Sequence, residues 1–362
     1  MRLFSLRFSV VAAFAGVTLA GGSPPAFAKA PEEASEAHSL LGSYLAGRIA
    51  RGLHDTDAAS EYYRRALLLD PGNEVLMEQA LAMEATEGRW DSALGFAKEL
   101  AALQPAHRTA RLMLGLSEAK SGRFAKAQEY FKSSGGGLMG ELTGALARAW
   151  TLAALGDVRG AMDAIDSVKQ AEWAQLFLRY HKALIYDVTG RRVEARALFE
   201  RAFRTDPKSL RIALAYAHHA AAAGDAKLAR ATLDEYARRS PNGQHPVTKA
   251  LGDRIKAGGK VGLLVATPLD GLAEVFYGLG DALSGEGGVN VGAIYLQMAI
   301  YLKPDFPFAF ASLASIYETT KKYDAAIATY DRIPRGTPLQ SAIDIRKAIN
   351  LNQLDRVEEA KD

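Results

Sequence analysis

Residues 110–131 read ARLMLGLSEAKSGRFAKAQEYF, where the pair Ser121-Gly122 separates two segments whose apolar residues recur with helical spacing. The glycine of this pair belongs to a series of glycines placed 34 residues apart. Chance would continue such a series through four more steps about once in 10⁴ tries. The series comprises Gly88, Gly122, Gly156, Gly190 and Gly224. This period indicates a tandem array of similar units.

The positions that keep the period have the residue types that a helical hairpin requires. A glycine can adopt the positive φ that ends one helix and turns the chain into the next. Five residues later an alanine lets two helices pass closely, and a proline after the second helix ends it. The alanines are Ala59, Ala93, Ala127, Ala161, Ala195 and Ala229, and the paired prolines are Pro71 with Pro105 and Pro207 with Pro241. One hairpin can bury its apolar side only against its neighbours, which predicts an all-α solenoid.

Two stretches carry a resemblance to a known family. Residues 110–131 and residues 317–330 (YETTKKYDAAIATY, with Pro338 after them) are similar to the tetratricopeptide repeat. The resemblance implies an all-α, α-α superhelical solenoid of tandem tetratricopeptide helix-turn-helix repeats. Within that family, the chain resembles the exported and periplasmic proteins of Gram-negative bacteria. No unit has the family's tryptophan at its fourth position, where Phe276 and Phe310 come nearest.

The spacing also predicts the domain organisation. Units begin near residues 40, 74, 108, 142, 176 and 210, and then near 273, 307 and 341. The period slips between Pro241 and Pro304, and Gly258-Gly259-Lys260 and Thr267-Pro268 interrupt the helical pattern there. We therefore expect a linker over 29–39, a six-repeat array over 40–241, an irregular or shortened hairpin over 242–272, and two repeats with a partial one over 273–362.

The first 28 residues have the layout of a secretory signal peptide. Arg2 and Arg7 precede the uncharged apolar run 8–20, and Ala26-Phe27-Ala28 is a small-x-small cleavage site. The run is shorter than the ~20 residues that span a bilayer, which disfavours the alternative of an uncut membrane anchor. No later stretch is long and apolar enough to be a membrane span. We expect cleavage after Ala28 and a periplasmic or secreted protein.

Charge and composition exclude several classes of partner and site. The chain has 44 basic and 41 acidic residues, and loss of Arg2 and Arg7 with the signal peptide leaves 42 − 41 = +1. This balance gives no reason to expect a nucleic acid or an acidic membrane as the partner. The absence of cysteine excludes disulfides, thiolate nucleophiles and thiolate-ligated zinc.

The sequence contains no recognisable catalytic, cofactor or metal motif. Gly259-Lys260 lacks the remainder of a phosphate-binding loop, and Gly278-Leu-Gly280 follows no strand and has no third glycine. His218 and His219 are adjacent and so point about 100° apart on a helix, which does not suit one metal ion. We therefore predict no enzyme activity, no cofactor and no metal site.

Stacked hairpins generate a concave face, and the resemblance implies that particular positions of each first helix line it. Aromatic residues and arginine at such positions suit a partner peptide or helix with apolar anchors. The alternative is that these side chains pack against neighbouring units as ordinary core. The predicted groove residues are Trp150, Phe177, Tyr180, Leu184, Arg211, His218, Tyr277 and Asp281.

The repeats and the lack of a recognisable catalytic motif favour a protein–protein interaction scaffold or adaptor that binds partner peptides or helices in its groove. A second hypothesis is the regulatory arm of an enzyme whose catalytic part lies beyond the C-terminus or on a partner chain, because the last unit stops inside its second helix. A third is self-association through the ends of the repeat array.

Overall fold

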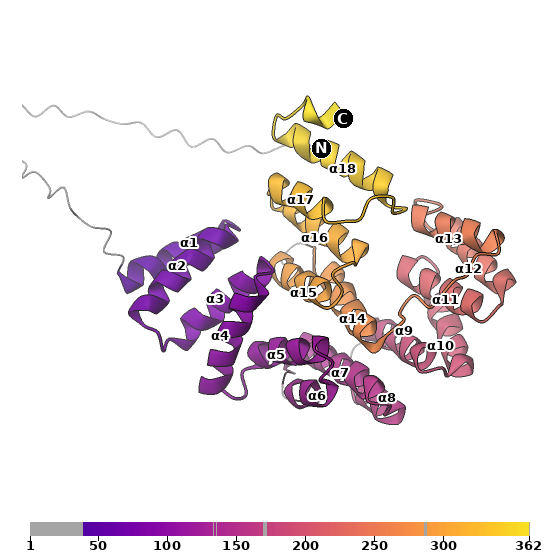
Figure 1. The fold of residues 1–362 in the computed structure, drawn as a ribbon, viewed down its shortest axis with the longest axis horizontal. Helices are drawn as coiled ribbons and strands as arrows, with labels where there is room; N and C mark the ends of the chain where they lie inside the picture. Colours follow the sequence, from indigo (N-terminus) through magenta and orange to yellow (C-terminus); the bar gives the residue numbers. More distant parts are fainter. Residues whose placement is uncertain (1–38, 133, 135, 169–171, 286–287, 362) are drawn as a thin grey trace, which may run out of the picture. The chain divides into compact units, whose positions relative to one another are not determined.

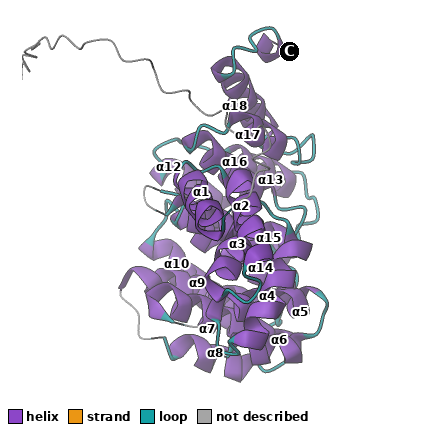
Figure 2. Ribbon diagram, turned by 90° about the vertical axis from the view of Figure 1, so that its left-hand side faces the viewer, coloured by secondary structure: helices purple, strands orange, loops and turns teal. Residues whose placement is uncertain are grey.

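The computed structural model describes residues 39–132, 134, 136–168, 172–285 and 288–361. In these ranges it contains eighteen α-helices, one short 3-10 helix over Glu359–Lys361 and no strand (Figure 2). The first twelve α-helices are α1 (Leu40–Gly52), α2 (Thr56–Leu69), α3 (Glu74–Thr86), α4 (Trp90–Leu103), α5 (Arg108–Lys120), α6 (Phe124–Phe131), α7 (Gly137–Ala154), α8 (Val158–Asp166), α9 (Glu172–Val188), α10 (Arg192–Thr205), α11 (Leu210–Ala222) and α12 (Ala226–Arg239). The others are α13 (Pro246–Lys256), α14 (Pro268–Ala282), α15 (Val289–Leu302), α16 (Pro307–Thr319), α17 (Tyr323–Tyr330) and α18 (Gln340–Gln353). The expected all-α solenoid is confirmed.

The glycines of the period end the first helix of their units in the left-handed region. The φ angles of the five glycines lie between 70° and 83°. Where a unit lacks this glycine, His54, Lys321 and Asp355 adopt φ angles of 57° to 60° at the equivalent turn. Gly258 extends the series by one further step, with a φ of 71° after α13. The same turn therefore follows the first helix in each of these units.

The small residues of the period lie where helices contact each other. The alanines at 93, 127, 161, 195 and 229 have no exposed surface. In the third hairpin, Gly115 on α5 likewise lets the two helices approach closely. A Cβ at this position would lie 2.4 Å from the ring of Phe131 on α6. Because the ring can approach the backbone this closely, Phe131 is almost fully buried, which contributes about 1.5–3 kcal/mol.

The segment 242–272, expected as an irregular or shortened hairpin, lacks a second helix of its own. It contains one helix, α13, followed by a non-helical stretch over 257–267, and α14 already begins at Pro268. The physical reason lies in the backbone preferences of the stretch. Gly258 ends α13, and Pro268 disfavours helical geometry at the residue before it. Thr267 then starts α14 with a capping box, in which its side chain and that of Asp270 bond each other's backbone N–H.

The hairpin of α14 and α15 packs inside the curve of the preceding hairpins. Figure 1 shows α14 and α15 enclosed between the α3–α5 region and the α7–α11 region. Helix α14 contacts α7 and α9, and α15 contacts α3 and α5. At the far end Lys322 Nζ lies 2.9 Å from Thr56 Oγ1, and Gln297 Nε2 donates to the Thr86 carbonyl at 3.1 Å. One continuous apolar core therefore joins both halves of the array.

The predicted signal peptide (1–28) and nearly all of the predicted linker lie outside the described residues, so the structure does not address them. Ser39, the last residue of that linker, accepts a hydrogen bond from the Gly42 N–H and so caps α1. Among the described helices, none combines the length and the apolar character needed to cross a bilayer.

Candidate functional site

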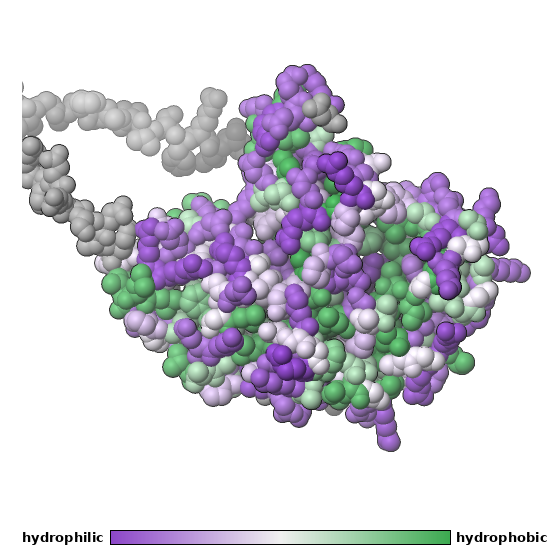
Figure 3. Space-filling model, in the orientation of Figure 1, coloured by the Kyte–Doolittle hydropathy of each residue, from purple (hydrophilic) through white to green (hydrophobic). Residues whose placement is uncertain are grey.

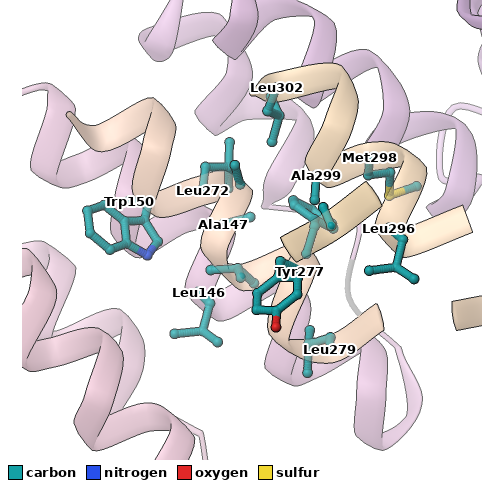
Figure 4. Close-up of a cluster of buried hydrophobic side chains, with 14 of the residues drawn as sticks. Leu146, Ala147, Trp150, Leu272, Tyr277, Leu279, Leu296, Met298, Ala299 and Leu302 are labelled. Atoms are coloured by element: carbon teal, nitrogen blue, oxygen red, sulfur yellow. The ribbon is translucent and has the colours of Figure 1, made fainter. Parts of the chain in front are cut away.

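The chain's own helix α14 packs over part of the concave face that the sequence predicts. Trp150 of α7 is only 1% exposed, and its ring lies against the backbone of Gly271. A Cβ at Gly271 would lie 2.2 Å from this ring, so the contact requires glycine. Figure 4 shows Leu146 and Trp150 among the buried side chains that also include Leu272 of α14. Trp150 therefore packs as core.

Helix α9 contributes the next predicted groove residues. Phe177 is half-buried against Gly278, where an added Cβ would lie 2.7 Å from the ring. Tyr180 is buried, and its hydroxyl donates to Glu274 Oε1 at 3.0 Å. Burial and the Glu274 charge hold the pKa of Tyr180 well above its usual range, which keeps the hydroxyl a donor. Leu184 is buried in the same core.

Arg211 and Glu274 form the central ion pair of this region. Arg211 Nε donates to Glu274 Oε1 at 2.9 Å, and a second guanidinium nitrogen donates to Oε2 at 2.5 Å. Burial alone would raise the pKa of Glu274, but the Arg211 charge and its hydrogen bonds outweigh burial and lower it. The guanidinium carbon also lies 5.0–5.6 Å from the ring centroids of Tyr277, Phe306 and Phe308. Arg211 is thus a cation held by one carboxylate and three aromatic rings.

His181 belongs to this region, although the sequence analysis did not select it. Its Nδ1 accepts from Trp150 Nε1 at 3.1 Å, and its ring makes edge contacts with Trp150, Phe177 and Tyr180. Burial lowers the pKa of His181 to about 4, against the opposing charge of Glu274. Its Nε2 has no hydrogen-bond partner among the described residues. Tyr180 and His181 are adjacent on an apolar helix, and nothing in this pattern marks His181 as the hydrogen-bond acceptor of Trp150.

The remaining predicted residues lie at the edge of the region. His218 is half-buried, and its Nδ1 lies 2.8 Å from the Gly262 carbonyl oxygen in the stretch before α14. Burial lowers the pKa of His218. Tyr277 is buried, whereas Asp281 at the end of α14 is exposed and accepts from Ser312 Oγ at 2.6 Å.

A pocket of about 240 Å³ remains open between α9, α11 and α14. Five of the eight predicted groove residues line it, together with Glu274, Gly278 and apolar or small neighbours. The five are Phe177, Tyr180, Arg211, Tyr277 and Asp281. Trp150, Leu184 and His218 do not line this pocket. Binding of a partner by any of the eight stays a prediction.

A second pocket of about 290 Å³ lies on the other side of the Arg211–Glu274 pair. Phe306 and Phe308 line it, and so do Lys303 and Asp270, which form an ion pair at 2.8 Å. The buried pair thus separates two small openings. Within the described part of the chain, no cluster of His, Asp or Glu side chains has the arrangement of a metal site.

Comparison with protein families identifies one recurring match. Sequence models described as Tetratricopeptide repeat match residues 189–251, residues 84–134, and residues 43–73 with 309–333. No curated protein matches the sequence.

Several solved structures are similar to the chain at low identity. The structure of Naa15/Naa10 bound to HypK-THB is 15% identical with a TM-score of 0.37, and the match covers 89% of this chain and 57% of that one. The P58(IPK) TPR domain is 15% identical with a TM-score of 0.27, covering 88% and 98%. The APC/C hetero-tetramer Cut9-Hcn1 is 13% identical with a TM-score of 0.34, covering 83% and 52%. The chain thus spans 57% of the length of the matched chain in the Naa15/Naa10 structure and 52% of that in the Cut9-Hcn1 structure.

Proposed function

Because this chain is a tetratricopeptide-repeat protein, we propose that it is a non-catalytic scaffold that holds partner proteins or peptides in the bacterial periplasm. Stacked repeats of this kind present extended surfaces that suit protein recognition. The signal-peptide pattern at the N-terminus supports export. The repeats support the interaction role, and the N-terminal pattern supports the periplasm as the compartment.

The observation that carries the proposal is the open pocket between α9, α11 and α14. Helix α14 occupies the part of the concave face where a partner helix would otherwise lie, and it shares one core with α7. Removing α14 would expose Trp150 and Leu272, which is costly at about 25 cal/mol per Å² of apolar surface. A partner therefore inserts a side chain into the pocket rather than replacing α14.

A crosslinking experiment tests this proposal. A photoreactive phenylalanine analogue is placed at Leu176, which lines the pocket, and in a control protein at the exposed Val193 of α10. Crosslinking in periplasmic extracts should yield a discrete product from position 176 and none from position 193. The product should disappear when Asp281→Lys is added and persist when Asp163→Lys is added, since Asp163 is exposed on α8. The same product from both positions, or no product in cells or extracts, would rule out the pocket as the partner site.

Export is tested separately. Cell fractionation should place the protein in the periplasm, and mass spectrometry should find Lys29 as its first residue. Retention in the cytoplasm with an intact N-terminus would contradict the proposed compartment.

Self-association through the repeat ends is a second candidate, favoured by an exposed apolar stripe on the first helix. Leu41, Leu45 and Ile49 of α1 and Leu53 directly after it are four residues apart and between 45% and 75% exposed. Residues with this spacing share one face of a helix. Figure 3 shows apolar surface at the α1–α2 end of the molecule. Such a stripe is where a preceding unit of a longer solenoid would stack.

Light scattering tests the second candidate. The protein should be larger than a monomer at high concentration, and Leu45→Glu with Ile49→Glu should make it monomeric. Because both side chains are exposed, the melting temperature should not fall. A wild-type protein that stays monomeric at every concentration would eliminate this candidate.

A further inference from the structure

The pocket between α9, α11 and α14 has a chemical character that specifies its ligand, and the inference that follows rests on the proposed function. We propose that this pocket binds a cationic side chain, arginine or lysine, of the partner. The size, the charge and the walls of the pocket each support this assignment.

The size selects a single side chain. An engineered cavity of about 150 Å³ holds one benzene molecule. The pocket, at about 240 Å³, has room for one long side chain. A helix with its side chains is ~10–12 Å wide and would not enter. The group that enters the pocket is therefore a single side chain and not a whole helix.

The charge of the lining selects a cation. Arg211 is neutralised by Glu274, which accepts two of its hydrogen bonds, and Tyr180 donates a third hydrogen bond to that carboxylate. Asp281 is the remaining charged residue of the lining, which leaves a net charge of −1. One Asp281 oxygen accepts from Ser312, and the described residues give the second oxygen no partner. An incoming cation can pair with it at the pocket mouth.

The walls suit a side chain with an apolar stem and a charged head. Phe177 and Tyr277 present aromatic surface to the pocket, and Leu176 and Ile212 add aliphatic surface. Cations bind favourably over aromatic faces, guanidinium groups above all. The protein already contains this chemistry, because Arg211 itself is held by Tyr277, Phe306 and Phe308.

Two matched peptides separate charge from shape. The purified protein is titrated with the capped peptide Gly-Ser-Arg-Ser-Gly and with the same peptide containing citrulline, a neutral isostere of arginine. Binding is followed by amide NMR, with the signals of Gly278 and Asp281 as local reporters. The arginine peptide should shift these signals with an affinity at least about fivefold higher than the citrulline peptide.

Two matched variants locate the charge. Asp281→Asn keeps the shape and the acceptor for Ser312, and it should weaken the arginine peptide about fivefold without affecting the citrulline peptide. Asp163→Asn on α8 should change neither affinity. Equal affinities for the two peptides, tighter binding of the citrulline peptide, or full binding of the arginine peptide by Asp281→Asn would overturn the inference. If these occur while the crosslink at Leu176 persists, the scaffold function stands and only the ligand chemistry is wrong.

Discussion

Arg211 of α11 and Glu274 of α14, 63 residues apart in the chain, form a buried ion pair with two hydrogen bonds of 2.9 and 2.5 Å. Their side chains are 16% and 3% exposed. The pair fixes α14 against the concave face of the preceding hairpins, and it forms the wall between the two open pockets. Arg211, which the sequence predicted to contact a partner, thus contacts Glu274 on the chain's own helix α14.

Removing one member of this pair should destabilise the protein strongly. Glu274→Leu leaves the Arg211 guanidinium buried without its counter-charge, and we expect a loss of about 3–5 kcal/mol in the free energy of unfolding. The double variant Arg211→Met with Glu274→Leu should recover much of this loss, because it leaves no buried charge. Urea denaturation measures both. A single variant as stable as the wild type would show that the pair does not hold α14.

The contact between Trp150 and Gly271 should not tolerate a side chain. Alanine in a helix interior is ordinarily about 1 kcal/mol better than glycine. At position 271 the added methyl would lie 2.2 Å from the Trp150 ring, so Gly271→Ala should instead cost about 1–3 kcal/mol. Gly262→Ala is the control, since nothing lies within 4 Å of a Cβ there. Thermal denaturation should separate the two variants, and equal melting temperatures would contradict the close contact.

His181 should make the fold sensitive to mild acid. Burial lowers the pKa of His181 to about 4 from an ordinary 6.5, so the unfolded chain binds a proton at a higher pH than the folded chain does. The contribution of neutral His181 to the free energy of unfolding is therefore complete above pH 6.5. It is lost as the pH falls toward 4, by about 3 kcal/mol.

The variant His181→Asn isolates this effect. Asparagine keeps an acceptor for Trp150 Nε1 but does not titrate in this range. Unfolding curves at pH 7, 5.5 and 4.5 should show a smaller fall for the variant than for the wild type. Parallel pH profiles of the two proteins would mean that His181 does not remain neutral in the fold.

The contact between α15 and the α3–α4 turn should depend on Gln297. The side chain is buried and donates to the Thr86 carbonyl at 3.1 Å, a bond between residues 211 positions apart. Gln297→Met has similar volume but leaves that carbonyl without this donor, and we expect a loss of about 1–3 kcal/mol. Gln175→Met on the exposed side of α9 should have little effect. Hydrogen exchange of α3 and α4 should accelerate only in the first variant.

The sequence by itself determined the hairpins. Gly122 and Gly190 each form a turn because glycine adopts a positive φ freely. Ala127 allows a close helix contact because its side chain is small. Both effects act over a few residues, so a fixed period in the sequence becomes a fixed period in the helices. In the segment 242–272, Gly258-Gly259 and Thr267-Pro268 interrupt the helical pattern, and the structure has a non-helical stretch over 257–267 there.

Only the tertiary structure decided what occupies the concave face. The residue types that line an open groove are also those that bury well against another helix, so Trp150, Tyr180 and Arg211 fit both arrangements equally in the sequence. Gly271 and Gly278 of α14 let the aromatic rings approach, and Glu274 supplies the matching charge, across separations that no local pattern encodes. Long-range packing therefore buried Trp150 and Leu184 and left the small pocket beside Asp281.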